Sequence, residues 1–171
     1  MALASVSPLP IIIYNVPGRT SSNITASTTL RLAHASDKFA AIKEASGDLA
    51  QATEILCGRP SHFLVLSGDD PLALALAGIG GDGVISVIAN SHPAEFSEMM
   101  RAALKGDFPK ARQLNNKLFP LHKWLYVDGN PAGIKAACSL LGICSNELRL
   151  PLVPMQDKNF QELKKTMESI G

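Results

Sequence analysis

A lysine, a tyrosine and an arginine lie at or just beyond the ends of two apolar segments of this 171-residue sequence. Lys43 ends the segment 39–43, Tyr14 ends the segment 10–14, and Arg19 follows the Pro-Gly turn after it. An amine that loses hydration in an apolar strand is more readily neutral and can then attack a ketone to form an imine. A planar guanidinium beside it suits the carboxylate of an α-keto acid. The three together predict imine chemistry on a keto acid.

Each of these residues also has a plainer interpretation when it is taken alone. Lys43 with Glu44 could be a solvated surface pair, and Tyr14 could be a half-buried aromatic residue with its hydroxyl at the rim. Arg19 could be only a surface charge. The combination favours a site, because side chains alternate along strands and this alternation would bring Tyr14 and Lys43 together at one end of a sheet.

Other residues of the kinds that carry chemistry form weaker patterns. Asp69 and Asp70 could bind a metal, but Asp70 is better explained as a helix cap, so we expect no metal and no cofactor. The glycine-rich run 78–83 precedes an apolar strand, whereas a dinucleotide-binding loop follows one. The cysteines Cys57, Cys138 and Cys144 have neither CxxC nor histidine-flanked spacing, which predicts three buried, reduced thiols.

The elements that would position the site are four short apolar strands, each followed by a helix. The strands are expected at residues 10–14, 39–43, 63–66 and 84–88, where apolar residues run without polar alternation, as in buried parallel strands. Thr25, Asp48 and Asp70 are predicted to cap the intervening helices. After the fourth strand we expect only helices, at 91–105 with Ser91 as cap, 108–126, 131–141 with Asn130 as cap, and 156–170.

Composition excludes several partners. The chain is 46% hydrophobic and 18% charged, with a formal net charge of +1, so we expect a cored globular protein that binds neither nucleic acid nor a membrane. The first seven residues lack the charged and apolar regions of a secretory signal, which predicts a cytoplasmic location. Parallel βα repeats fit either an open doubly wound sheet or a (β/α)8 barrel, and four strands are too few to close the barrel.

Several motifs together resemble the dihydrodipicolinate synthase family of pyruvate-dependent aldolases. They are YNVPGRT at 14–20, IKEASGD at 42–48, SGDD at 67–70, GGDGVISVIAN at 80–90, DGNPAGIKAA at 128–137 and LRLPLVP at 148–154. The resemblance implies an α/β fold with the last four βα units of a (β/α)8 TIM barrel, followed by a C-terminal helical segment. It divides the chain into a non-matching segment 1–8, a partial barrel 9–106 with the catalytic lysine, and helices over 107–171.

The resemblance also implies residue roles. Lys43 would form the Schiff base with pyruvate, Tyr14 would relay protons, and Arg19 would bind a substrate carboxylate. Backbone around Gly68, together with Ile85 and Val87 on the last strand, would lie beside pyruvate. The implied reaction condenses pyruvate with aspartate semialdehyde to give 4-hydroxy-tetrahydrodipicolinate, on the diaminopimelate route to lysine.

Two alternatives stay open. Sialic-acid lyases and keto-deoxy-sugar aldolases use the same imine chemistry, although the PGRT turn with Arg19 favours the synthase. The family's N-terminal half, with its paired threonines and second tyrosine, has no counterpart here, so the chain could instead be a non-catalytic, truncated remnant. An incomplete barrel would leave open strand edges and an uncovered apolar face, which predicts a homo-oligomer.

Overall fold

The computed structural model describes residues 1–170 and forms two compact units, Met1–Ser86 and Val87–Gly171. The first unit contains the sheet, and the second is helical. This division differs from the expected boundary near residue 106. The reason is that the helix Pro93–Leu104 (α6) packs against Phe108–Tyr126 (α7) and so belongs with the C-terminal helices.

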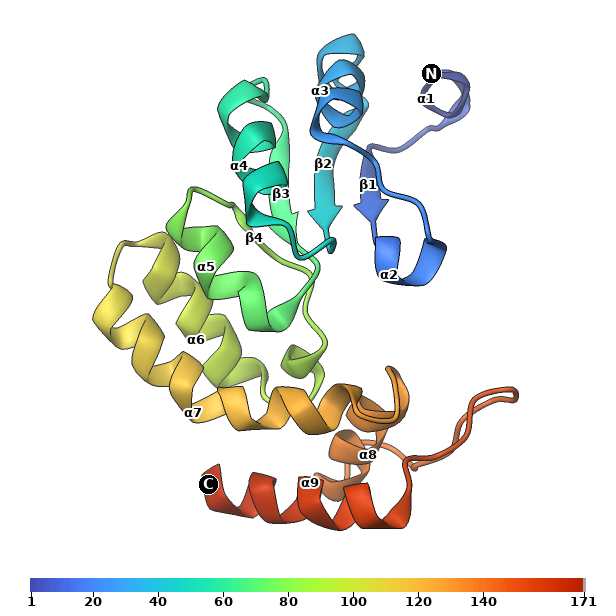
Figure 1. Ribbon diagram of the computed structural model, residues 1–171, viewed down its shortest axis with the longest axis vertical. Helices are drawn as coiled ribbons and strands as arrows, with labels where there is room; N and C mark the ends of the chain where they lie inside the picture. The colour runs from blue at the N-terminus through green and yellow to red at the C-terminus, as the bar shows by residue number, and fades with distance from the viewer. Residues whose placement is uncertain (171) are drawn as a thin grey trace. The chain divides into compact units, whose positions relative to one another are not determined.

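The first unit is built on a parallel sheet whose strands follow chain order (Figure 1). The strands are β1 (Ile11–Asn15), β2 (Phe39–Glu44), β3 (Leu64–Ser67) and β4 (Gly83–Val84). The first three confirm the prediction to within one residue at each end. The prediction of the fourth strand at 84–88 was wrong. Its pairing stops where β3 ends, at Ser67, whose carbonyl accepts from the Ile85 amide at 2.9 Å. A 3-10 turn, η2 (Ile88–Asn90), follows.

Helices follow each of the first three strands, as predicted. They are α2 (Pro17–Thr20), α3 (Ala26–Ala35), α4 (Leu49–Gly58) and α5 (Ala73–Gly78), with α1 (Ala2–Val6) before the sheet. Thr25 caps α3 by accepting from Thr28 N, and Asp48 caps α4 by accepting from Ala50 N and Gln51 N. The third cap was wrong, because a 3-10 turn, η1 (Asp70–Leu72), precedes α5 and buries Asp70 as its first residue.

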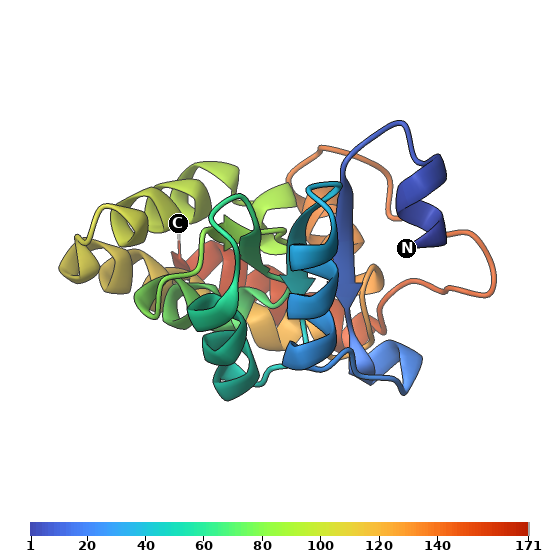
Figure 2. The same ribbon diagram turned by 90° about the horizontal axis from the view of Figure 1, so that it is seen from above.

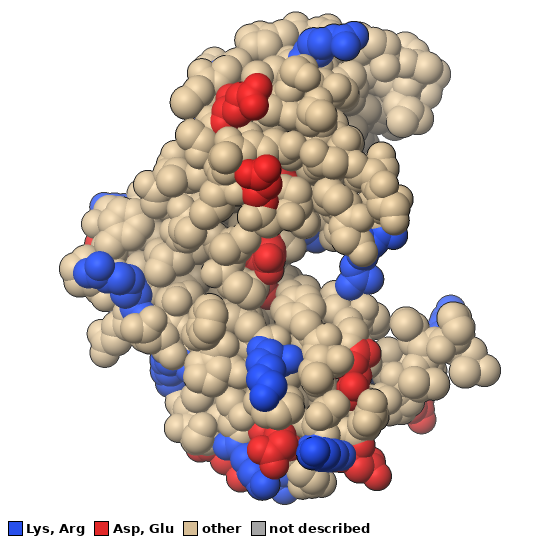
Figure 3. All heavy atoms as spheres, in the orientation of Figure 1, with Lys and Arg blue, Asp and Glu red and all other residues tan. Residues whose placement is uncertain are grey.

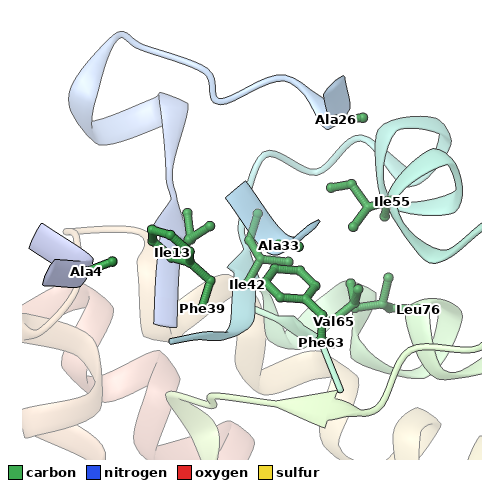
Figure 4. Packing of buried hydrophobic residues seen from close by; sticks show 11 residues of the cluster. Ala4, Ile13, Ala26, Ala33, Phe39, Ile42, Ile55, Phe63, Val65 and Leu76 are labelled. Atoms are coloured by element: carbon green, nitrogen blue, oxygen red, sulfur yellow. The ribbon is translucent and has the colours of Figure 1, made fainter. Parts of the chain in front are cut away.

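The core of this unit lies between the sheet and α3 and α4, which pack side by side on one of its faces (Figures 1 and 2). Ile13, Ile42 and Val65 project from three neighbouring strands into this layer and are each less than a tenth exposed (Figure 4). They meet Ile55 of α4 and Phe63 in one apolar cluster. We call this side of the sheet the outer face and the opposite side the inner face.

The second unit consists of α6, α7, α8 (Ala132–Leu140) and α9 (Asp157–Ile170). The bounds of α7 are those predicted, and the other three lie within two residues of their predicted ends. The predicted caps Ser91 and Asn130 were wrong by one position. Pro93 occupies the first turn of α6, which makes His92 the cap residue, and α8 likewise begins after Pro131.

Surface properties agree with a mixed-charge protein. Acidic and basic side chains are interspersed on the face shown in Figure 3. Within the described residues, every helix is too short or too polar to cross a membrane. The cysteine prediction was wrong in part, because Cys57 and Cys144 are exposed and only Cys138 is buried, while all three thiols are free.

Candidate active site

Lys43 and Tyr14 form the centre of the candidate site on the inner face of the sheet. They are register partners on β2 and β1, so the parallel pairing places their side chains next to each other. The Lys43 Nζ atom lies 4.2 Å from the centre of the Tyr14 ring, a cation–π contact. Lys43 is half-buried and Tyr14 is 48% exposed, which leaves the amine within reach of a small molecule.

Gly68 fits against the stem of this lysine. A Cβ atom at position 68 would stand 3.1 Å from both Cγ and Cε of Lys43 and only 2.6 Å from the Cβ of Ala45. The Gly68 amide also donates to the Glu44 carbonyl at 2.7 Å. The missing side chain therefore lets β3 close on β2 while Lys43 stays extended along the inner face.

The remaining predicted residues occupy different places. Arg19 lies exposed on α2, one short turn beyond the carboxyl end of β1. Ile85 follows β4 directly and is 40% exposed. Val87 was predicted to lie on the last strand, but it precedes η2 and belongs to the second unit. The structure thus brings Tyr14, Lys43 and Gly68 together and puts Arg19 at the same carboxyl edge of the sheet as Tyr14.

A buried carboxylate lies directly behind the lysine, and sequence reasoning missed it. Glu44 is 6% exposed and Asn15 is 1% exposed, on the outer face beside the apolar core. The side-chain amide nitrogen of Asn15, Nδ2, donates to both Glu44 carboxylate oxygens, at 3.2 and 3.0 Å. The side-chain oxygen of Asn15, Oδ1, accepts from the Ile24 backbone amide at 3.0 Å. One side chain therefore connects β1, β2 and the segment before α3.

Other donors complete the hydrogen bonding of the Glu44 side chain. The Ser46 amide donates to it at 2.7 Å, and the Gln51 side chain donates at 3.1 Å. The Asn23 side chain joins the same network. Its Oδ1 accepts from Asn15 Nδ2 at 2.8 Å, and its Nδ2 donates to Gln51 Oε1 at 2.9 Å. Buried charges need such hydrogen bonds, because desolvation otherwise costs several kcal/mol. The network therefore fixes the backbone that follows Lys43 and the loop that leads from Arg19 to α3.

One further carboxyl near the site has a perturbed ionisation. Burial raises the pKa of Asp69 above its ordinary value of 3.8, and the neighbouring Asp70 raises it further. The pair follows Gly68 at the end of β3. Among residues 1–170, no group of three or more His, Cys, Asp or Glu side chains is arranged to hold a metal ion.

Fold and site together define a parallel α/β protein with a reachable lysine and a phenol at the carboxyl ends of its strands. The model of the dihydrodipicolinate synthetase family matches residues 1–170, the first eight included. The chain belongs to this family. It is 47% identical over 169 residues to the 4-hydroxy-tetrahydrodipicolinate synthase of Phocaeicola vulgatus, covering 99% of this chain and 57% of that protein.

Other relatives give the same result. The 4-hydroxy-tetrahydrodipicolinate synthase of Parabacteroides distasonis is 45% identical over 170 residues, which are 99% of this chain and 57% of that protein. The dihydrodipicolinate synthase structure from Thermotoga maritima superposes with a TM-score of 0.96 at 38% identity, covering 99% of this chain and 59% of that one. The Aquifex aeolicus structure gives 0.95 at 40% identity, with 98% and 57% covered. The chain thus spans somewhat more than half the length of these relatives.

Proposed function

We propose that this chain carries the Schiff-base lysine of a 4-hydroxy-tetrahydrodipicolinate synthase. The neutral Lys43 amine attacks the ketone of pyruvate, and loss of water gives an imine. Loss of a methyl proton then forms an enamine, whose carbon attacks the aldehyde of aspartate semialdehyde. Cyclisation onto the imine carbon releases Lys43. Tyr14 moves protons in these steps, and Arg19 holds a substrate carboxylate.

The single observation that carries the proposal is the Lys43–Tyr14 pair on the inner face. The Lys43 amine lies 4.2 Å from the centre of the Tyr14 ring, near the carboxyl ends of parallel strands. A nucleophile and a proton carrier are thus next to each other where such proteins place their active sites. Gly68 supports it by keeping the lysine stem unobstructed. For Ile85 and Val87 we propose positions beside the bound pyruvate, supported by the family resemblance of the segment 80–90.

We also propose that the sheet is part of a (β/α)8 barrel and that the chain works as a homo-oligomer. The inner face supports this, since Ile12, Tyr14 and Leu64 are 50%, 48% and 43% exposed. Sedimentation should show a dimer or a higher oligomer, and a monomer at all concentrations would contradict it.

The proposed location of the reaction is the cytoplasm. Its support is that all three cysteines are free thiols, one of them exposed on α4 and one on the segment after α8. Free, exposed thiols are typical of compartments that keep cysteines reduced.

Borohydride trapping tests the proposed imine. Incubation with pyruvate followed by reduction should add one reduced pyruvate unit to the chain, and peptide mapping should place it on Lys43. The Lys43→Arg variant should lose the adduct, whereas Lys38→Arg, which changes an exposed lysine before the same strand, should keep it. Tyr14→Phe should form the adduct more slowly. An adduct that persists in Lys43→Arg would overturn the assignment.

The same experiment separates the alternatives. An adduct followed by turnover with aspartate semialdehyde supports the synthase. An adduct with turnover only on sugar-derived aldehydes points to the other pyruvate-dependent aldolases. Absence of any adduct in the wild-type chain shows that it is non-catalytic.

A further inference from the structure

Two cysteines of the second unit share one cavity. A cavity of about 440 Å³ is lined by Cys138 and Cys144 together with Asn90, Ile134 and Lys135. Cys138 belongs to α8 and is buried, whereas Cys144 lies six residues further along the chain and is exposed. Cys57, the third cysteine, lies in the first unit on α4.

The backbone at the end of α8 brings the two thiols together. The Ile143 amide donates to the Cys138 carbonyl at 2.9 Å, and the Gly142 amide donates to the Ser139 carbonyl at 3.0 Å. Gly142 has a φ of +71°, the left-handed conformation of a helix-ending Schellman turn. This turn reverses the chain, so the residue after Ile143 returns to the side of the helix where Cys138 lies.

The two thiols differ in environment in a way that suits sequential reaction. The Cys138 Sγ donates to the Asn90 carbonyl at 3.6 Å. Burial raises the pKa of the Cys138 thiol, and the adjacent Cys144 raises it further through its charge and a hydrogen bond, while Lys135 acts in the opposite direction. Burial thus shields the Cys138 thiol from solvent, and the exposed Cys144 is the sulfur that an oxidant reaches first.

We propose that Cys138 and Cys144 form a reversible disulfide when the protein meets hydrogen peroxide. The Cys144 thiolate attacks one peroxide oxygen and cleaves the O–O bond, which gives a sulfenic acid and, after protonation, water. The Cys138 sulfur then attacks the Cys144 sulfur, the S–O bond breaks, and a second water leaves as the S–S bond forms. Two electrons pass from the two thiols to one peroxide molecule. The proposal is independent of the aldolase activity.

Disulfide formation would change the second unit locally. Cys138 would lose the S–H group that it donates to Asn90, and the sulfur pair would narrow the cavity. The segment that leads from Cys144 to α9 would be fixed to the end of α8. Added thiol reductant would reverse these changes.

Thiol counting and peptide mapping after peroxide treatment test the proposal. The full chain should lose two of its three thiols, and a single peptide should contain the 138–144 cross-link, which dithiothreitol removes. Cys57→Ser, the matched control, should form the same cross-link. Cys144→Ser should form none, and Cys138→Ser should stop at a sulfenic acid on Cys144 that dimedone traps.

Two results would overturn the proposal. One is oxidation of Cys144 to a sulfinic acid in the wild-type chain without any 138–144 cross-link. The other is a cross-link that always includes Cys57, because Cys138 and Cys144 would then not be paired with each other.

Discussion

The two faces of one sheet differ sharply in this molecule, and adjacent residues of β2 illustrate it. Ile42 is fully buried on the outer face, against the layer formed by α3 and α4. Lys43 points to the inner face and lies beside Tyr14, which is half exposed. The period of two along a strand separates these environments by a single residue. The outer face therefore provides the stability of the unit, and the inner face is left for chemistry.

The polar network extends this comparison to the end of the strands. Asn15 and Glu44 lie on the outer face, where their neighbours Ile13 and Ile42 are apolar core residues. Their hydrogen bonds hold the ends of β1 and β2 together and so fix the backbone from which the Lys43 side chain extends on the inner face. Substitutions on the outer face should consequently change stability most, and substitutions on the inner face should change chemistry most.

The largest expected effect is that of Ile42→Ala on the outer face. Loss of a fully buried side chain and the resulting cavity should lower the free energy of unfolding by about 2–5 kcal/mol. Ile12→Ala, on the inner face and 50% exposed, should cost about 1 kcal/mol or less. Urea unfolding of both variants measures the difference. Equal losses would break the distinction between the two faces.

The next effect is that of Glu44→Ala. The Asn15 side chain, the Ser46 amide and the Gln51 side chain would lose their common acceptor, at a cost of roughly 3 kcal/mol in unfolding free energy. Glu54→Ala, an exposed change on α4, should stay within about 0.5 kcal/mol of the wild type. A neutral Glu44→Ala variant would show that the network is dispensable.

Gly68→Ala should affect both stability and chemistry. The new Cβ would overlap Ala45 and press on the Lys43 stem, which should cost about 1–3 kcal/mol and slow the pyruvate adduct measured by borohydride trapping. Gly18→Ala is the control, since a Cβ there meets nothing within 4 Å. If both variants trap pyruvate at the wild-type rate, Gly68 does not position the lysine.

The smallest effect is expected from Asp69→Asn. Because burial raises the Asp69 pKa in the folded protein, its stabilising contribution is present below the ordinary value of 3.8 and is lost as pH rises through the raised value. The variant should therefore be slightly more stable than the wild type at neutral pH, and the difference should disappear under acid conditions. Urea midpoints across this range measure it, and a less stable variant at neutral pH would contradict the sign.

Local patterns in the sequence were sufficient for much of this architecture. Three strands, the caps Thr25 and Asp48, and the bounds of α7 were predictable because they depend on residues within a few positions of each other. The shared face of Tyr14 and Lys43 also followed from alternation along strands. The fourth strand was not predictable in this way, because its length depends on where its neighbour β3 ends.

The sequence by itself determined that a lysine and a tyrosine lie near the ends of two parallel strands, and its motifs indicated the family. Only the tertiary structure decided that Glu44 is buried rather than solvated, that Gly68 makes room for the lysine stem, and that Cys144 returns to Cys138. The physical reason is distance along the chain. Asn15 and Glu44 are 29 residues apart, and hydrogen bonds between such distant residues exist only once the strands have paired.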